Sequence, residues 1–234
     1  MQATVAEKRE VAKGTLLVLF AVDEYPDYRP GSYFWVELPS RGHEDEKGLR
    51  RHISHVTSPT ETGVVGLATR LRDTAFKRTL AEIEVGAEVE VEEPKGSFLL
   101  PEDTGAEYVF IAGGIGITTF RSMLRYIADK RLPYWVTLVY SNRDRESSAF
   151  LDELEELEQR IDGLRVILTM TDDAGWDGET RRLDADVLRD LLGSLDGKQF
   201  LVAGPPEMTE SVSDSLLAAG VQDERVLASK FSGY

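Results

Sequence analysis

The chain of 234 residues is long enough for one large or two small domains, and its 41% apolar and 29% charged residues are typical of a soluble globular protein. Its 42 acidic and 27 basic residues give a net charge of −15, which disfavours nucleic acid and anionic membranes as partners. The lack of cysteine excludes disulfides, thiolate-bound zinc and an iron–sulfur cluster held by this chain, and three histidines without metal-ligand spacing disfavour a metal enzyme.

The first part of the chain, up to about Phe98, predicts antiparallel β structure. Its apolar and β-branched residues come in short segments separated by turn residues such as Pro30-Gly31 and Ser58-Pro59. We expect strands over residues 15–22, 33–38, 52–57, 64–72 and 88–92. One helix is expected over 74–81, with Asp73 as its cap. Five or six strands with one helix favour a small β-barrel.

The second part alternates near-continuous apolar strands with helices, after a polar stretch at 101–105. Strands are expected over residues 108–112, 135–140, 164–169, 200–203 and 226–228, and helices over 118–130, 148–161, 184–192 and 206–219. This alternation predicts a doubly wound parallel sheet. The fold class is therefore two-domain, with an antiparallel β-barrel domain at 1–101 followed by an α/β domain at 102–234.

The sharpest local signal is Gly113-Gly114-Ile115-Gly116-Ile117-Thr118, between an expected buried strand and a helix. Residues without side chains let backbone amides and a helix N-terminus approach a phosphate, so the loop favours a dinucleotide. A tight turn without a ligand is the alternative. A second turn, Gly204-Pro205-Pro206, follows another parallel strand, so two strand-end loops converge on one crevice.

Ser141-Asn142-Arg143 stands where the adenosine end of a dinucleotide would lie, and no acidic residue for the ribose 2′-hydroxyl follows that strand directly. Arg143, with Arg145 as second candidate, favours the 2′-phosphate of NADPH over NADH, although an ordinary surface arginine is the alternative. In the first part, the arginines of Arg50-Arg51-His52-Ile53-Ser54 are suited to a pyrophosphate and Ser54 to a flat heterocycle, although two arginines on a surface turn are the alternative. Arg72-Asp73-Thr74 adds helix amides and a hydroxyl for phosphate, with Thr74 as an ordinary first residue of a helix as the alternative.

The order of these pieces resembles the ferredoxin–NADP reductase superfamily, over residues 3–234. Two motifs of the first part carry the resemblance: Arg51-His52-Ile53-Ser54 is similar to the family's Arg-x-Tyr-Ser/Thr flavin motif, and Lys95-Gly96-Ser97-Phe98 is similar to its Pro-x-Gly-x-Phe strand exit. In the second part, Gly113-Gly114-Ile115-Gly116-Ile117 is similar to its Gly-Gly-x-Gly-Ile nucleotide loop, and Gly204-Pro205-Pro206-Glu207-Met208 is similar to its Cys-Gly-Pro-Pro-x-Met turn. The last residues, Phe231-Ser232-Gly233-Tyr234, are similar to its aromatic ending. The resemblance implies a flavin-binding barrel followed by a pyridine-nucleotide domain.

Carried over residue by residue, the resemblance implies that Arg51 contacts the flavin phosphate, Thr74 holds the FAD pyrophosphate, and Phe231 or Tyr234 covers the flavin ring. Ser54 would approach flavin N5, so Ser54, Phe231 and Tyr234 are the residues expected at the reaction. Cofactor contacts are expected from Arg51, His52, Ile53, Ser54, Arg72, Thr74, Gly113, Gly114, Gly116, Ile117, Thr118, Ser141, Asn142, Arg143, Gly204, Pro205 and Tyr234.

Two departures from the family pattern stand near the expected chemistry. Ile53 replaces the Tyr that usually stacks on the flavin, and Ala203 replaces the Cys that usually precedes Gly-Pro-Pro. The implied cofactors are FAD and NADP, with NAD possible. Hydride would pass from NAD(P)H to FAD, and electrons would pass singly to a separate acceptor.

The function expected first is an NAD(P)H reductase of a small carrier such as ferredoxin or flavodoxin. Such carriers are usually acidic, so a local basic patch is needed, with candidates at Arg50, Arg51, Arg70, Arg72, Lys77 and Arg78. The alternatives are an NAD(P)H reductase of free flavin, quinone or ferric chelate, and a non-enzymatic flavin-binding subunit of a larger complex. We expect a cytoplasmic location without a membrane partner, because the apolar runs are short and no signal-peptide core is present. The net charge disfavours a nucleic-acid partner, and the resemblance implies a monomer.

Overall fold

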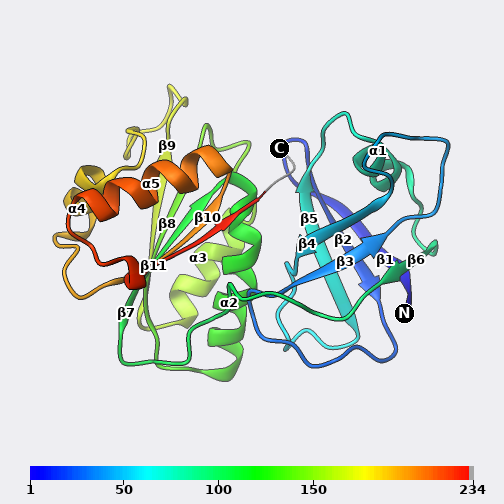
Figure 1. Cartoon of the computed structure of the whole chain (residues 1–234), viewed down its shortest axis with the longest axis horizontal. Coiled ribbons are helices and arrows are strands. Elements are labelled where there is room, and N and C mark those ends of the chain that lie inside the picture. The colour runs from blue at the N-terminus through cyan, green and yellow to red at the C-terminus, as the bar shows by residue number, and fades with distance from the viewer. Residues whose placement is uncertain (232–234) are drawn as a thin grey trace.

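The computed structural model of the chain describes residues 1–231. An antiparallel sheet of six strands and a parallel sheet of five strands flanked by helices lie side by side (Figure 1). The expected fold class is confirmed. The boundary at 101–102 falls in the segment between the two sheets and stays a prediction.

The first sheet has the strand order β4-β3-β6-β1-β2-β5, and all its neighbours are antiparallel. Its strands are β1 (Gln2–Ala12), β2 (Thr15–Ala21), β3 (Tyr33–Glu37), β4 (Arg50–Ser54), β5 (Val64–Arg70) and β6 (Glu88–Val91). The sequence did not predict β1. Of its residues only Ala3 and Val5 are buried, so its hydrophobic pattern is weak, and the strand is held by backbone pairing with β2 and β6.

Helix α1 (Ala75–Glu82) joins β5 to β6 and closes one end of the barrel core. Its buried residues Phe76 and Leu80 pack among strand residues such as Phe20 and Leu67. The prediction of Asp73 as cap is wrong. The cap is Thr74, whose hydroxyl accepts a hydrogen bond from the backbone N–H of Lys77 at 3.3 Å.

The antiparallel sheet is an open barrel in the described part of the chain. The ladder does not continue from β4 to β5, which are the two edges of the sheet. Just beyond β4, the N–H of Val56 donates to the carbonyl of Gly66 on β5 at 2.9 Å, and this bond joins the two edges at one end. An opening between β4 and β5 therefore remains along the rest of the barrel wall.

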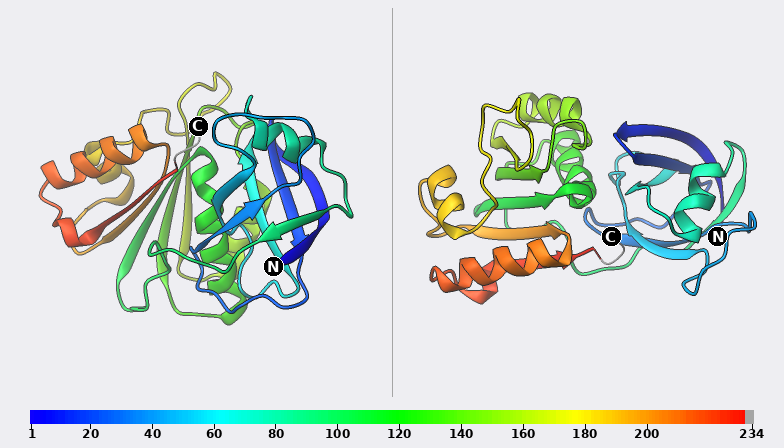
Figure 2. Two further views of the ribbon diagram at one scale, coloured as in Figure 1. Left: turned by 45° about the vertical axis from the view of Figure 1, so that its right-hand side comes forward. Right: turned by 90° about the horizontal axis from the view of Figure 1, so that it is seen from above.

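The second sheet has the order β11-β10-β7-β8-β9, and all its strands are parallel. Its strands are β7 (Glu107–Gly113), β8 (Trp135–Asn142), β9 (Leu164–Met170), β10 (Gln199–Gly204) and β11 (Val226–Lys230). Helices α2 (Ile117–Lys130) and α3 (Leu151–Arg160) cover one face, and α4 (Ala185–Leu192) and α5 (Pro206–Ala218) cover the other (Figure 2). Two short 3-10 turns are η1 (Gly114–Gly116) and η2 (Asp223–Arg225).

The order of the parallel strands reverses between β7 and β10, which is where open α/β sheets form a crevice at their carboxyl ends. The turns after these two strands touch directly. A Cβ on Gly116 would lie 2.2 Å from the carbonyl oxygen of Ala203, and one on Gly113 would lie 2.1 Å from Sδ of Met208. These glycines therefore allow the two turns to meet at the crevice.

The two parts of the chain share one apolar core. Leu17 of β2, Ala68 of β5 and Val56 are buried in the same cluster as Phe120 and Met123 of α2. This contact fixes the open side of the barrel against the parallel sheet. Within residues 1–231, none of the helices combines the length and apolar character needed to cross a membrane.

Replacing Gly116 by Ala is expected to lower the free energy of unfolding by about 1–3 kcal/mol, because the added methyl meets a backbone carbonyl that cannot rotate away. Gly175→Ala is the matched control, since its Cβ would lie an ordinary 3.5 Å from Oδ1 of Asp173. Urea unfolding of both variants checks this. Equal midpoints for the two variants would contradict the packing account.

Candidate functional site

The opening of the barrel faces the carboxyl ends of the parallel strands. Strand β5 lies against η1, the glycine turn that follows β7. Beside this contact, Arg70 donates from its guanidinium to the carbonyl of Ser147 at 3.3 Å, and the N–H of Lys13 donates to the carbonyl of Glu146 at 2.8 Å. The flavin motif on β4 and the nucleotide loop after β7 are thus brought to the same region.

Strand β4 turns its two neighbouring arginines to opposite faces. Arg51 points toward α1, with its guanidinium carbon 5.5 Å from the ring centroid of Phe76. Arg50 lies 4.3 Å over the ring of Trp35 and pairs with Glu92. Arg51 is therefore the one of the two that is aimed at the predicted phosphate region.

The other predicted residues of β4 follow the same alternation. Ile53 is half-buried and packs against the barrel core on the side of Arg51. His52 is exposed on the opposite face, edge-on to Trp35 at 5.0 Å and Tyr33 at 5.4 Å between ring centroids. Ser54 ends the strand, partly accessible. The structure thus separates His52 from the side that carries Arg51 and Ile53.

Cationic side chains gather where β4, β5 and α1 meet. Burial, followed by the positive charges of Arg72, Arg51 and Arg70, lowers the pKa of Lys77 to about 8. Like charges at this distance repel one another, and an anion bound among them relieves that repulsion. Nη2 of Arg51 is buried and has only an ion-pair contact with Asp45 at 3.6 Å, while its Nη1 donates to the carbonyls of Lys47, Gly48 and Arg50. The cluster therefore has the electrostatics of a phosphate site.

A carboxylate already lies at the N-terminus of α1. Asp45, from the β3–β4 loop, accepts a hydrogen bond from the N–H of Ala75 at 2.8 Å, and its other oxygen lies 3.6 Å from Nη2 of Arg51. The bond from Ala75 holds the pKa of Asp45 below its ordinary value. The side chain shows that this junction favours an anion. The sequence analysis missed Asp45, because nothing in its local pattern marks the contact with α1.

In the nucleotide loop, most of the predicted residues are buried. Gly113, Gly116 and Ile117 pack against the neighbouring turn and core, and the hydroxyl of Thr118 donates to the carbonyl of Ile115 at 3.0 Å. Gly114 is more accessible and has a φ of +51°. Within residues 1–231, no side chain caps the N-terminus of α2 that follows. The N–H of Ile117, the first amide of α2, donates to the carbonyls of Gly114 and Ile115, so α2 offers a phosphate the positive end of its dipole rather than this amide.

Asn142 lies beside this loop at the end of β8. It is 7% exposed, and its side chain contacts the hydroxyl of the buried Tyr140 without ideal hydrogen-bond geometry. Its Oδ1 is 3.9 Å from the position that a Cβ on Gly114 would take. Asn142 thus places a side-chain amide beside the glycine turn.

The adenosine side of the crevice contains acidic as well as basic groups. Ser141 is half-buried, and Arg143 is exposed with its carbonyl accepting from the N–H of Asp172 at 2.7 Å. The N–H of Arg145 donates to the Asp173 carboxylate at 3.2 Å. Carboxylates suited to a ribose 2′-hydroxyl therefore lie beside guanidinium groups suited to a 2′-phosphate. The sequence analysis missed this loop after β9, although its position at the end of a parallel strand was a usable signal.

The chain end approaches the same crevice. The N–H of Phe231 donates to the carbonyl of Gly204 at 3.0 Å, and its ring packs against the core that contains Ala203. Pro205, half-buried, lies against Gly113. Figure 1 shows β11, which leads to Phe231, running toward the barrel. Tyr234 lies outside the described residues.

The residue after Ser54, which the sequence analysis did not select, is a fully buried histidine. His55 is stacked 4.2 Å from the ring of Tyr28 and 4.6 Å from that of Phe34. Its Nε2 lies 3.0 Å from the hydroxyl of Tyr25, and burial lowers its pKa to about 4. His55 is therefore neutral and anchors the end of β4 next to Ser54.

Comparison with known proteins agrees with this arrangement. Residues 110–214 match the family model of the oxidoreductase NAD-binding domain. The chain is 32% identical over 165 residues to methane monooxygenase component C of Methylosinus trichosporium, covering 70% of this chain and 46% of that protein. It is also 26% identical over 201 residues to a subunit of the Na(+)-translocating NADH-quinone reductase of Psychrobacter cryohalolentis, covering 81% of this chain and 46% of that protein. The chain thus spans about half the length of these two relatives.

The fold is shared with solved reductase structures. The flavohem-like FAD/NAD-binding domain of nitric oxide dioxygenase from Vibrio cholerae superposes with a TM-score of 0.86 and 21% identity over 98% of both chains. This likeness shows that the chain shares its two-sheet fold with that domain.

His55 predicts acid sensitivity of the fold. The unfolded chain protonates this histidine near the ordinary pKa of 6.5, whereas the native state stays neutral down to about 4, so stability falls as the pH falls through this window. Lowering the pH from 8 to 5 should cost about 2 kcal/mol of unfolding free energy through this group. Urea unfolding of His55→Gln should lack that component, while the exposed His52→Gln retains it. An unchanged pH profile in His55→Gln would contradict the assignment.

Proposed function

We propose that this chain, a member of the ferredoxin–NADP reductase superfamily, is a flavin-dependent oxidoreductase that oxidises NAD(P)H and passes electrons to a separate acceptor. One observation carries the proposal. The open side of the barrel, with a cationic cluster at one end, faces a glycine turn that leads directly into helix α2, with the buried side-chain amide of Asn142 beside it. Two anion-binding regions thus face each other across one contact.

The flavin side fits FAD at its phosphates. Arg51, Arg70, Arg72 and Lys77 would hold the pyrophosphate together with the N-terminus of α1 at Thr74, and the negative charge of the ligand would relieve their mutual repulsion. Asp45 would have to yield part of this junction to the phosphate. Along β4, Ile53 would lie against the flavin ring, and Ser54 would reach its N5 region.

On the nucleotide side, the Gly114 turn and the positive end of the α2 dipole would take the pyrophosphate of NAD(P)H, with the side-chain amide of Asn142 beside them. Ser141 and Arg143 would contact the adenosine ribose, and Arg143 supports NADP with NAD as the second choice. Gly113, Gly116, Ile117, Thr118, Gly204 and Pro205 would act by shaping the turns. We propose that Phe231 or Tyr234 covers the flavin ring until nicotinamide displaces it.

The chain's own part in the reaction is to bind, orient and exclude water. FAD, when bound, supplies the redox chemistry, in which the hydride lost by NAD(P)H is taken up at N5 and electrons leave one at a time. The neutral, buried His55 fixes the end of β4, and therefore the position of Ser54.

For the acceptor, we propose a small electron carrier such as ferredoxin or flavodoxin. The sequence relative in methane oxidation is by its name a component of a monooxygenase, which is compatible with a separate acceptor. A cytoplasmic monomer remains our proposal. The second candidate is the reduction of free flavin, quinone or ferric chelate. Two arginines of the predicted basic patch are paired with carboxylates, Arg50 with Glu92 and Arg78 with Asp73. This pairing lowers the positive charge available for docking an acidic carrier and therefore favours the second candidate. Salt-sensitive turnover supports the carrier, and salt-insensitive turnover supports the small acceptor.

The function is tested by anaerobic titration of the FAD-reconstituted protein with NADPH and with NADH. We expect a bound-flavin absorbance near ~450 nm that bleaches on addition of the nucleotide. The nucleotide that bleaches it at the lower concentration identifies the preferred cofactor. A protein that retains no FAD would instead support the non-enzymatic subunit.

The phosphate assignment predicts different effects for two adjacent arginines. Arg51→Ala should weaken FAD binding by about 10- to 100-fold, because it removes charge-assisted hydrogen bonds to phosphate. Arg50→Ala is the control, since Arg50 faces Trp35 and Glu92 on the other side of the strand. Fluorescence titration with FAD measures both. Equal loss of affinity would contradict the orientation of β4 toward the flavin.

A further inference from the structure

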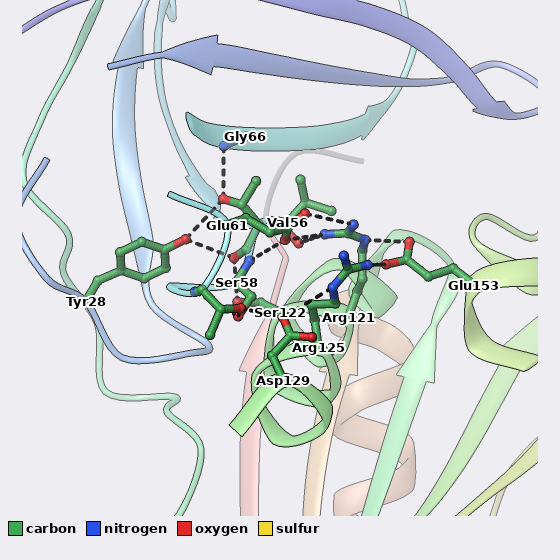
Figure 3. Close-up of polar contacts among 12 residues, drawn as sticks. Tyr28, Val56, Ser58, Glu61, Gly66, Arg121, Ser122, Arg125, Asp129 and Glu153 are labelled. Carbon is green, nitrogen blue, oxygen red and sulfur yellow. Dashed lines mark hydrogen bonds and ion pairs between the residues drawn. The ribbon is translucent and has the colours of Figure 1, made fainter. Parts of the chain in front are cut away.

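Arg121 is a buried cation at the contact between the two parts of the chain (Figure 3). It lies in the second turn of α2 and is 6% exposed. Its guanidinium donates to the carbonyl of Val56 at 2.5 Å, to Glu61 at 3.1 Å and to Glu153 at 2.8 Å. The side chain thus joins the segment after β4 to α2 and α3.

Burial of a guanidinium is tolerated only where acceptors surround it, and here they come from both parts of the chain. Glu61 also accepts from the N–H of Ser58 at 2.7 Å, which shapes the turn that presents its carboxylate. Beside this network, the hydroxyl of Ser122 donates to the carbonyl of Thr57 at 2.7 Å. Loss of the Arg121 fork would leave two carboxylates and the Val56 carbonyl without their shared cation.

The contacts of Arg121 lie close to both halves of the site. Val56 is two residues after Ser54, and its N–H joins the edges of the open barrel through Gly66. On the other side, Arg121 is four residues after Ile117, where α2 leaves the nucleotide turn. One guanidinium therefore spans from the end of the flavin strand to the start of the nucleotide helix.

We propose that Arg121 is a positioning residue for hydride transfer, holding the end of β4 and the start of α2 at the spacing that the reaction requires. The inference rests on the proposed function. Misplacement of reacting groups by about 1 Å can cost about 100-fold in rate, whereas binding at sites within each part is less affected. Arg121 would thus act on the rate of transfer more than on either affinity.

Arg125 provides a matched control on the same helix. It is one turn further along and pairs with Glu153 at 3.1 Å and with Asp129 at 3.4 Å, both in the second part of the chain. Arg121→Lys and Arg125→Lys keep the charge and remove the planar fork in each case. Only the first substitution breaks the fork that connects α2 to Val56 and Glu61.

The first readout uses the FAD-free protein. Asp129, the partner of Arg125, accepts a hydrogen bond from Thr60, so the comparison uses residues 54–58. Hydrogen–deuterium exchange over this segment should be at least about tenfold faster in Arg121→Lys than in the parent, and unchanged in Arg125→Lys, because the lost fork held the segment to α2. Unchanged exchange in Arg121→Lys would overturn the inference. This exchange measurement does not require FAD. A protein that binds no flavin would therefore contradict the proposed function and leave the exchange result valid.

The second readout uses the FAD-loaded protein in rapid mixing with excess nucleotide. We expect the limiting rate of flavin bleaching to fall about 10- to 100-fold in Arg121→Lys, with dissociation constants for FAD and nucleotide within about threefold of the parent. A normal bleaching rate, or a rate loss matched by weaker binding of both cofactors, would overturn it. If Arg121→Lys does not fold, Glu61→Gln tests the same link with the same expected direction.

Discussion

The apolar contact between barrel and parallel sheet is the constraint on which the site depends. Leu17, Val56 and Ala68 share a core with Phe120 and Met123, so the unpaired edges β4 and β5 are held facing the carboxyl ends of the parallel strands. A free barrel opening would expose unpaired strand edges to other chains. Here the edge strand β5 is set against η1, at the place that we assign to the cofactors.

Charge is distributed unevenly in support of this arrangement. The chain carries a net charge of −15, yet four cations meet near the N-terminus of α1, where burial and the three neighbouring arginines lower the pKa of Lys77 to about 8. At the interface, Arg121 is instead matched by carboxylates from both sides. The first cluster is suited to binding an external anion, and the second is satisfied within the protein. The cluster near α1 therefore has the character of a ligand site, and the cluster around Arg121 has the character of a structural link.

The features predicted correctly from the sequence are those that local residue patterns determine. The alternating strands and helices, the glycine turns and their order along the chain led to the correct fold class and superfamily. Strand β1 was not predicted because few of its residues face the core. The roles of Asp45, His55 and Arg121 were not predicted because they depend on partners from other segments of the chain, which no local pattern shows. The assigned roles of Ser54, Arg143 and the chain end stay predictions.

The most direct test of the account is a crystal structure of the protein with FAD. We predict that the flavin ring lies in the opening between β4 and β5, with its phosphates on Arg51 and the N-terminus of α1 and its ring edge near Ser54, facing the Gly114 turn. Density for FAD elsewhere, or phosphates away from Arg51, would contradict the central claim that the contact between the two parts builds one shared site.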